Sequence, residues 1–330
     1  MGQEEQAPAD GAAMQKALKV NRIFYRGQTG ALYGIWLTQM FLTILTLGIY
    51  HFWAKTNLRR YLFGAMELDG DRFEYLGTGK ELFLGMLKIM PFYVLIVAML
   101  GGVQYKYGEH GVVIAELFLL PLVFFLIPVA AYSGFRYRVN RTSWRGVRGV
   151  MRGSAFAFGG KFILGSLISF ATLGIMIPSV DLKRWEYQVK YMNFGNVPFR
   201  FQGESGRLNG VNIVTLLLFP FTMGISRLWY NAALQREKMR GLSLGNLRFR
   251  LTATAGNYFG LALGNMFILL LTLYIGMPFV LQRNMRFFER HLAVGGEIQE
   301  LTALQAAMGK AGDAEGLLDV LDVDMGVIGA

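Results

Sequence analysis

The chain has 330 residues, of which 53% are hydrophobic and only 17% charged, and its mean hydropathy is +0.36. A soluble domain usually carries about 25% charged residues, so this composition favours a membrane protein. Cysteine is absent, which excludes disulfides and thiolate sites, and the three histidines are too far apart in sequence to suggest a metal or catalytic cluster. No paired carboxylates or nucleophile–base set stands out. We therefore expect neither a cofactor nor an enzyme.

The formal net charge of +11 is unevenly distributed along the chain. The stretch 296–330 holds seven acidic residues and one lysine, so the rest of the chain carries about +17. Its basic residues flank apolar runs, which suits contact with anionic lipid headgroups. They form no separate basic domain, so we do not expect a nucleic-acid partner. Membrane lipids are the expected partners, and association between copies of the chain is left open.

Six apolar runs of membrane length follow an expected flexible polar tail, residues 1–22, which lacks the apolar core of a signal peptide. The loop Tyr105–His110 is so short that the runs on either side of it should form an antiparallel hairpin, kinked by three prolines. The stretch 297–330 is expected to be mostly flexible. The predicted spans are about Ala31–Trp53, Leu82–Gln104, Gly111–Ser133, Phe156–Val180, Leu208–Tyr230 and Gly256–Leu281.

Polar connectors between the spans mix basic and aromatic residues. Ala54–Met66 is typical of an amphipathic helix in the headgroup layer, and Arg72–Tyr75 after it alternates like a strand. The segments 181–207 and 231–250 repeat this order. We interpret their basic and aromatic residues as interfacial anchors, with a headgroup-binding site as the alternative. The candidate anchors are Trp53, Arg59, Arg60, Trp185, Trp229 and Arg236.

The sequence Thr46-Leu47-Gly48-Ile49 recurs at 172–175, as Thr-Met-Gly-Ile at 222–225 and more loosely at 272–276. Residues 24–83 align without a gap on 200–259, with 16 identities in 60 positions. These matches predict an internal duplication, with a first half at 23–199 and a second at 200–296. If every run crosses once, the fourth and sixth runs oppose the first and fifth. Such an inverted arrangement is common in transporters.

The membrane orientation cannot be predicted from these spans. With six crossings, about 14 lysines and arginines fall on one side and about 16 on the other, whereas the positive-inside rule needs an excess. Either the signals are weak or some runs are re-entrant. The nearly uncharged loop at 105–110 is the best candidate for the outer face.

Three ionisable residues lie within predicted spans: Lys88, Glu116 and Lys161. Such residues are costly in lipid and often functional, but each lies near enough to a span end for its charge to reach the interface. Lys88 and Glu116 differ in depth by roughly 15 Å at 1.5 Å per residue, so they should not pair. The absence of deep, convergent charges weighs against a coupled pump.

The run Leu45–Lys55, together with Arg59-Arg60-Tyr61 and Gly70–Phe83, resembles the YjgN family of bacterial inner-membrane proteins. The similarity extends over about 24–296 and is weaker in the second half. The family is of unknown function, so the resemblance implies a multi-pass protein of the bacterial inner membrane and supplies no reaction.

The sequence thus predicts an all-α polytopic membrane protein, with about six transmembrane helices in internal repeats, interfacial amphipathic helices and short strand-like connectors. The leading functional hypothesis is a non-enzymatic transporter or channel for a small solute or lipid. The alternative is a structural or lipid-organising membrane protein that binds anionic headgroups.

Overall fold

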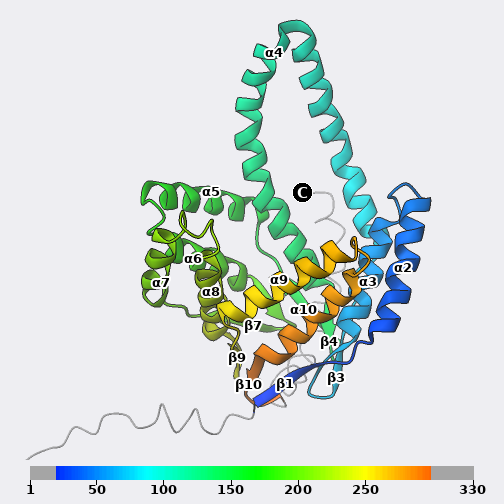
Figure 1. Ribbon diagram of the computed structural model, residues 1–330, viewed down its shortest axis with the longest axis vertical. Coiled ribbons are helices and arrows are strands. Elements are labelled where there is room, and N and C mark those ends of the chain that lie inside the picture. The colour runs from blue at the N-terminus through cyan, green and yellow to red at the C-terminus, as the bar shows by residue number, and fades with distance from the viewer. Residues whose placement is uncertain (1–19, 299–330) are drawn as a thin grey trace, which may run out of the picture.

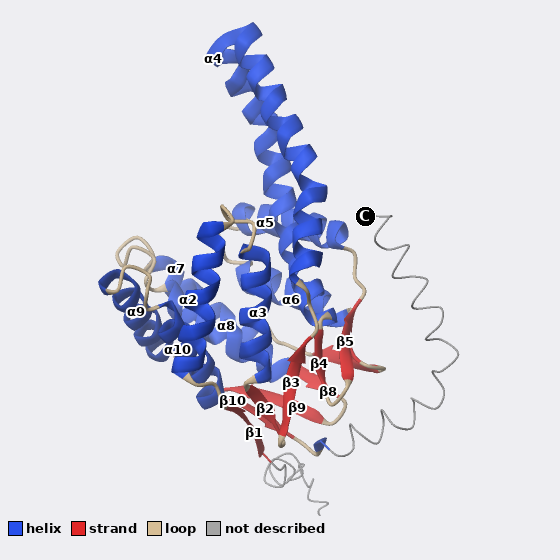
Figure 2. Ribbon diagram, turned by 90° about the vertical axis from the view of Figure 1, so that its right-hand side faces the viewer, coloured by secondary structure: helices blue, strands red, loops and turns tan. Residues whose placement is uncertain are grey.

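A computed structural model describes residues 20–298 and divides them into two tiers. Short strands form a barrel at one end, and helices form a ring above it, from which one long hairpin rises (Figures 1 and 2). The prediction of an all-α protein with six spans is wrong, because the ten described strands close an antiparallel barrel and one described helix alone is long and apolar enough to cross a membrane. The predicted terminal tails lie mostly outside the described residues.

One arrangement of a strand, two antiparallel helical segments and a second strand recurs five times. The first unit consists of β1 (Val20–Tyr25), α2 (Thr29–Leu45), α3 (His51–Gly64) and β2 (Met66–Leu68). The others are β3 (Asp71–Tyr75), α4 (Gly79–Asn140) and β4 (Thr142–Trp144); β5 (Val147–Met151), α5 (Ala155–Ala171), α6 (Ile177–Lys190) and β6 (Met192–Phe194); β7 (Val197–Phe201), α7 (Gly206–Leu217), α8 (Arg227–Gly241) and β8 (Leu242–Leu244); and β9 (Leu247–Leu251), α9 (Ala255–Leu271), α10 (Met277–His291) and β10 (Leu292–Gly295).

A backbone hydrogen bond closes every unit where its second helix meets its first strand. The donor residues of successive units are separated by the same number of residues, except where the longer helix α4 lies between them. The predicted boundary between two halves, at 199/200, falls inside strand β7. The closing bonds run from Arg26 N to Ala65 O, Leu76 N to Arg141 O, Arg152 N to Tyr191 O, Gln202 N to Gly241 O and Thr252 N to His291 O, over 2.7–3.2 Å.

The barrel is packed with apolar side chains. Its strands alternate between buried apolar and exposed polar residues, as on β9, where Arg248 and Arg250 face outward. The first and last strands close the ring, with Asn21 opposite Val294. The alternating segments noted in the sequence are therefore members of one barrel, not isolated connectors. Its core contains Ile23, Leu68, Trp144, Val197, Leu244, Leu247, Val294 and Ile298, with Phe73, Phe194, Phe199 and Phe249 packed against them.

The Thr-Leu-Gly-Ile segments are tight turns that reverse the chain. Leu47 and Gly48 have φ angles of 49° and 93°, and the same two positions have positive φ in the other three copies. The Thr46 hydroxyl donates to Leu42 O (2.7 Å) and accepts from Tyr50 N (2.9 Å), so it satisfies backbone groups on both sides of the turn. Four of the predicted spans therefore fold back instead of continuing.

Helix α4 is a hairpin in its own right. Its helical path breaks at Gly108 (φ 66°, ψ −160°), and the two arms match the second and third predicted spans. At the base, the Glu81 carboxylate accepts from Tyr137 Oη and from Arg141, both over 2.7 Å, which ties the start of one arm to the end of the other. The arm from Gly79 to Gly108 is about 43 Å long at 1.5 Å per residue.

Candidate membrane interface

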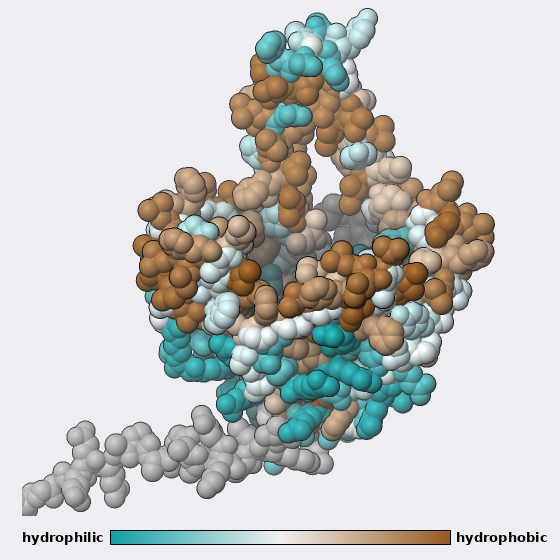
Figure 3. Space-filling model, viewed as in Figure 1, coloured by the Kyte–Doolittle hydropathy of each residue, from teal (hydrophilic) through white to brown (hydrophobic). Residues whose placement is uncertain are grey.

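The four short turns expose large apolar side chains at their tips. Leu47 is 95% exposed, Leu173 82%, Met223 96% and Leu273 84%. Each stands beside further exposed apolar residues, such as Ile49 and Phe221. Together with the helices they form an apolar belt at one level, with hydrophilic residues below it around the barrel (Figure 3). An apolar surface of this extent on a folded protein indicates contact with a membrane or a partner.

The short hairpins are too short to cross a bilayer. The apolar first helices α2, α5 and α9 have 17 residues each and α7 has 12, whereas a crossing helix needs about 20. Each returns to the barrel through a second, more polar helix. α4 differs, because exposed apolar residues such as Met99 and Phe118 lie on its two arms beyond the positions that correspond to the short tips. The end of α4 is hydrophilic again (Figure 3).

The basic residues lie on one side of this apolar layer. Between Lys88 and Arg136, Lys106 at the α4 turn is the only lysine or arginine. The other described lysines and arginines belong to the lower part of α4, to the short hairpins or to the barrel. The even split expected from six crossings assumed that each apolar run changes sides. With turns in place of crossings, the charge becomes strongly one-sided.

A cluster of cations lies where α3 meets the base of α4. Lys55 and Arg59 are one turn apart on α3 and so share a face. Burial lowers the pKa of Lys55, and the nearby charges of Arg59 and Arg138 lower it further. Arg59 donates to Tyr75 Oη over 3.2 Å, and its guanidinium lies over the Tyr75 ring. Within the described part of the chain, none of the three cations forms an ion pair.

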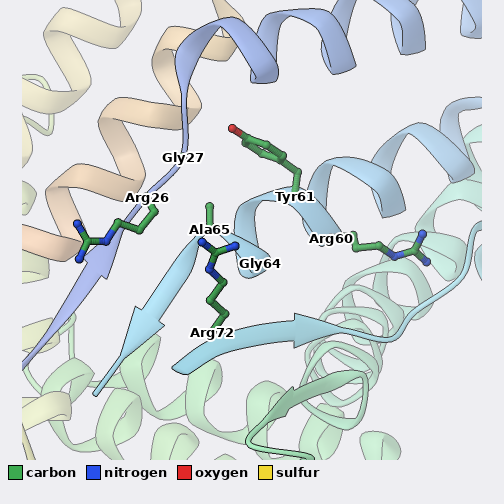
Figure 4. Close-up of a pocket in the computed structure, with 7 residues that line it drawn as sticks. All are labelled: Arg26, Gly27, Arg60, Tyr61, Gly64, Ala65 and Arg72. Atoms are coloured by element: carbon green, nitrogen blue, oxygen red, sulfur yellow. The ribbon is translucent and has the colours of Figure 1, made fainter. Parts of the chain in front are cut away.

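A second group of arginines lines a pocket of about 250 Å³ between β1, α3 and β3. Their guanidinium groups point in different directions: Arg26 and Arg60 extend away from the centre, and Arg72 reaches toward the end of α3 (Figure 4). Arg26 pairs with Glu67 (3.4 Å), and Arg60 donates to Gly77 O (3.2 Å). A cation at a helix C-terminus stabilises the helix dipole. This pocket therefore fits a structural role better than a ligand site.

The ionisable residues predicted within spans are not brought together. Lys88 and Glu116 are exposed on opposite arms of α4 and form no ion pair in the described chain. At 1.5 Å per residue, Lys88 lies about 18 Å farther from the break at Gly108 than Glu116 does, and so nearer the barrel. Lys161, on α5, places its amine 5.6 Å from the centre of the Tyr187 ring.

Two of the predicted anchors, Arg60 and Arg236, connect neighbouring units of the ring of helices. Arg60 and Arg236 each donate to a carbonyl at the same spacing further along the chain, Gly77 O and Ala253 O. Arg136, which sequence reasoning missed, makes the same bond to Gly153 O. These arginines connect the first, second and fourth units to the start of the hairpin that follows each of them. Their recurrence at matching positions was the available signal.

The predicted aromatic anchors have mixed environments. Trp53 packs against Phe83 and lies so close to Gly79 that a Cβ there would be 2.6 Å from its ring. Trp185 is partly buried beneath the Lys238 amine, 5.4 Å from its ring centre. Trp229, just past a tip, is 53% exposed and alone suits contact with lipid directly. Sequence reasoning missed the tip residues themselves as the main apolar contact.

A family model described as bacterial protein of unknown function (DUF898) matches residues 21–222 and again residues 209–320. Inner membrane protein YjgN of Salmonella typhimurium (strain LT2) is 32% identical over 125 residues, which is 38% of this chain and 30% of that protein. Inner membrane protein YjgN of Escherichia coli (strain K12) is 38% identical over 114 residues, 34% of this chain and 27% of that protein. The chain thus aligns with less than a third of each relative's length. No solved structure matches it.

Proposed function

This chain belongs to the DUF898 family of bacterial proteins of unknown function, and we propose that it organises anionic lipids in the inner membrane and catalyses no reaction. The resemblance to YjgN noted from the motifs is confirmed. The names of the relatives support a location in the bacterial inner membrane. The observation that carries the proposal is the apolar belt of re-entrant tips above a one-sided basic surface.

In the proposed arrangement, α4 crosses the membrane twice and the four short hairpins enter one leaflet from the barrel side. Polar or charged residues are rare along the exposed faces of the tips, whereas the ends of the hairpins near the barrel are basic. By the positive-inside rule the barrel then faces the cytoplasm, with the α4 turn on the opposite side. This makes the protein multi-pass through a single hairpin.

The cluster of Lys55, Arg59 and Arg138 is the proposed headgroup contact. Three cations that have no acidic partner among residues 20–298 attract an anion, and the negative inner leaflet supplies one at the level where the hairpins leave the membrane. Tyr75 holds Arg59 in place and adds a hydroxyl to the cluster. A lipid phosphate would satisfy guanidinium donors that no carboxylate of the described residues contacts.

Lipid binding by purified, delipidated protein tests this proposal. Native mass spectrometry would compare phosphatidylglycerol with phosphatidylcholine for the wild type, for Lys55→Gln/Arg59→Gln/Arg138→Gln, and for Arg148→Gln/Arg200→Gln/Arg248→Gln on the barrel exterior as a control of equal charge loss. A surface-proximal cation contributes about 1 kcal/mol, so the cluster variant should lose on the order of 100-fold in affinity at low salt. Equal binding of both lipids by the wild type would contradict the proposal.

Transport of a small solute or lipid stays a prediction. Tandem units support it, since repeated architectures are common in transporters. The apolar side chains that fill the barrel leave no support for a path along its axis within the described chain. Uptake or leak in proteoliposomes would restore transport as the leading function.

Internal duplication is also proposed. The family model matches twice, with overlapping ranges, and the unit-closing hydrogen bonds recur at a constant step outside α4. Five tandem copies of one ancestral unit, the second extended within its hairpin, account for both observations. Association between copies of the whole chain is left as an expectation.

A further inference from the structure

The four short hairpins make the protein's cross-section different in the two leaflets. Each pair of short helices turns back at its tip, so eight helices occupy only the layer next to the barrel. The two arms of α4 occupy that layer too and alone continue beyond it. In the described chain, one leaflet therefore holds ten helical segments and the other holds two.

The excess area is large. A helix with its side chains is about 10 Å wide, so eight additional segments add a minimum of roughly 600 Å² to one leaflet, the value for upright helices. Inclined helices, such as α5 in Figure 1, add more. The exposure of Leu47, Leu173, Met223 and Leu273 shows that no other part of the described chain covers the tips. Lipid tails are the proposed cover. An amphipathic insertion of this kind, limited to one leaflet, is sensitive to membrane curvature.

We infer that the protein is a curvature-selective wedge, which favours membranes whose barrel-side leaflet is convex. Extra area in one leaflet is accommodated at least cost where that leaflet is the outer surface of a bend. The inference rests on the membrane arrangement given under the proposed function, in which α4 crosses and the short hairpins enter one leaflet. It does not depend on headgroup charge. Selectivity for anionic lipid and selectivity for curvature can therefore fail separately.

The orientation of the 330-residue chain in vesicles of different size tests this inference. The chain has no cysteine, so Pro198→Cys on the barrel exterior and Glu109→Cys at the α4 turn can each report their side to a membrane-impermeant maleimide. Both positions are exposed. The ratio of barrel-outward to barrel-inward protein should rise severalfold from large extruded vesicles to small sonicated ones, in zwitterionic and anionic lipid alike.

A tip variant provides the matched comparison. Asparagine tolerates the left-handed backbone of the turns, so Leu47→Asn/Leu173→Asn/Met223→Asn/Leu273→Asn removes the apolar tips while respecting their φ angles of 46–50°. It should lose the dependence on vesicle size. The control Leu47→Met/Leu173→Met/Met223→Leu/Leu273→Met should keep it.

Two results would overturn the inference. One is an outward fraction that is the same, or lower, in small vesicles for the two single-cysteine proteins with unaltered tips. The other is a tip variant that is folded by circular dichroism and retains the full size dependence. Labelling of positions 109 and 198 from the same side would instead contradict the proposed membrane arrangement, and with it the proposed function. Loss of headgroup selectivity alone would leave the wedge intact.

Discussion

The long hairpin of the second unit and the short hairpins of the other four stand on the same frame. Each rises from a strand and returns to the next strand through the same closing hydrogen bond. The second unit is longer than its neighbours because α4 has 62 residues, and its turn is formed by Gly108 instead of Thr-Leu-Gly-Ile. The greater length of α4 therefore separates a hairpin that can cross a bilayer from hairpins that can only enter one leaflet.

The largest effect should come from making the long hairpin short. By the unit spacing, positions 96–125 of α4 occupy the place of 46–49 in the first unit. Replacing the segment 96–125 with Thr-Leu-Gly-Ile should give a fifth short hairpin, and none of the described residues would then lie on the far side. Alkaline carbonate should then extract far more of it from membranes than of the wild type. A variant that remains fully resistant would show that the short hairpins cross as well.

The next effect concerns the turns that distinguish the short hairpins. Gly174 has a φ of 86°, a conformation that costs an L-residue about 1–2 kcal/mol. Gly174→Val should lower the free energy of unfolding by about that amount, measured by thermal denaturation in detergent. Gly160→Ala is the control, because it lies in the helix α5 with open space at its Cβ and should be neutral or stabilising. Equal losses in both variants would argue against a turn at 172–175.

The contacts of Glu81 at the base of the long hairpin, here called the clamp, should contribute less to stability. Glu81 accepts hydrogen bonds from Tyr137 and Arg141 and completes the capping box with Thr78. Glu81→Gln should therefore destabilise the protein by about 1–2 kcal/mol, since hydrogen bonds to charged groups are stronger than neutral ones. Glu109→Gln at the exposed α4 turn should change stability by less than about 0.5 kcal/mol. Similar melting shifts for the two variants would contradict the clamp.

The smallest effect lies at the joint that both kinds of hairpin share. Tyr25 and Tyr75 occupy equivalent strand positions, but Tyr75 Oη accepts from Arg59, whereas Tyr25 Oη is buried without a partner in the described chain. Tyr75→Phe should cost about 1 kcal/mol and Tyr25→Phe almost nothing. Thermal melts of the two variants side by side would decide this, and a larger loss for Tyr25→Phe would contradict it.

The same tyrosine predicts a dependence on alkaline pH. Burial raises the pKa of Tyr25 from 10.0 to about 12. A group with a raised folded pKa contributes stability that is complete below its unfolded pKa and declines as pH rises toward the folded value. Stability should therefore fall between about pH 10 and 12, and Tyr25→Phe should reduce that fall without abolishing it.

The sequence predicted the long hairpin correctly but misjudged the short ones, for a physical reason. In the run from Ala31 to Trp53, Leu47 and Ile49 continue the apolar character through the turn. Hydropathy reports only that residues are apolar enough to lie in lipid. A turn within lipid is as apolar as a crossing helix, so hydropathy does not distinguish them. The turn sequence held the missing information, because a Gly at φ of about 90° beside a Thr that bonds to both flanks is a reversal.

The barrel could not be predicted for a different reason. Its strands have three to six residues, and closure pairs β1 with β10, which lie at opposite ends of the described chain. Alternation marks such short segments but says nothing about their partners. The overlay that matched Arg60 with Arg236 did identify equivalent residues, and only the structure shows that both hold carbonyls at the ring joints.

Cysteine accessibility across the first hairpin tests the central claim most directly. Gln28 and Asp69 are accessible just before α2 and just after β2, so Gln28→Cys and Asp69→Cys report where the hairpin starts and ends. The account predicts that both label from the cytoplasmic side in intact cells and inverted vesicles, while Glu109→Cys labels from the opposite side. Labelling of positions 28 and 69 from opposite sides would mean that the Thr-Leu-Gly-Ile hairpin crosses the membrane, and would contradict the account.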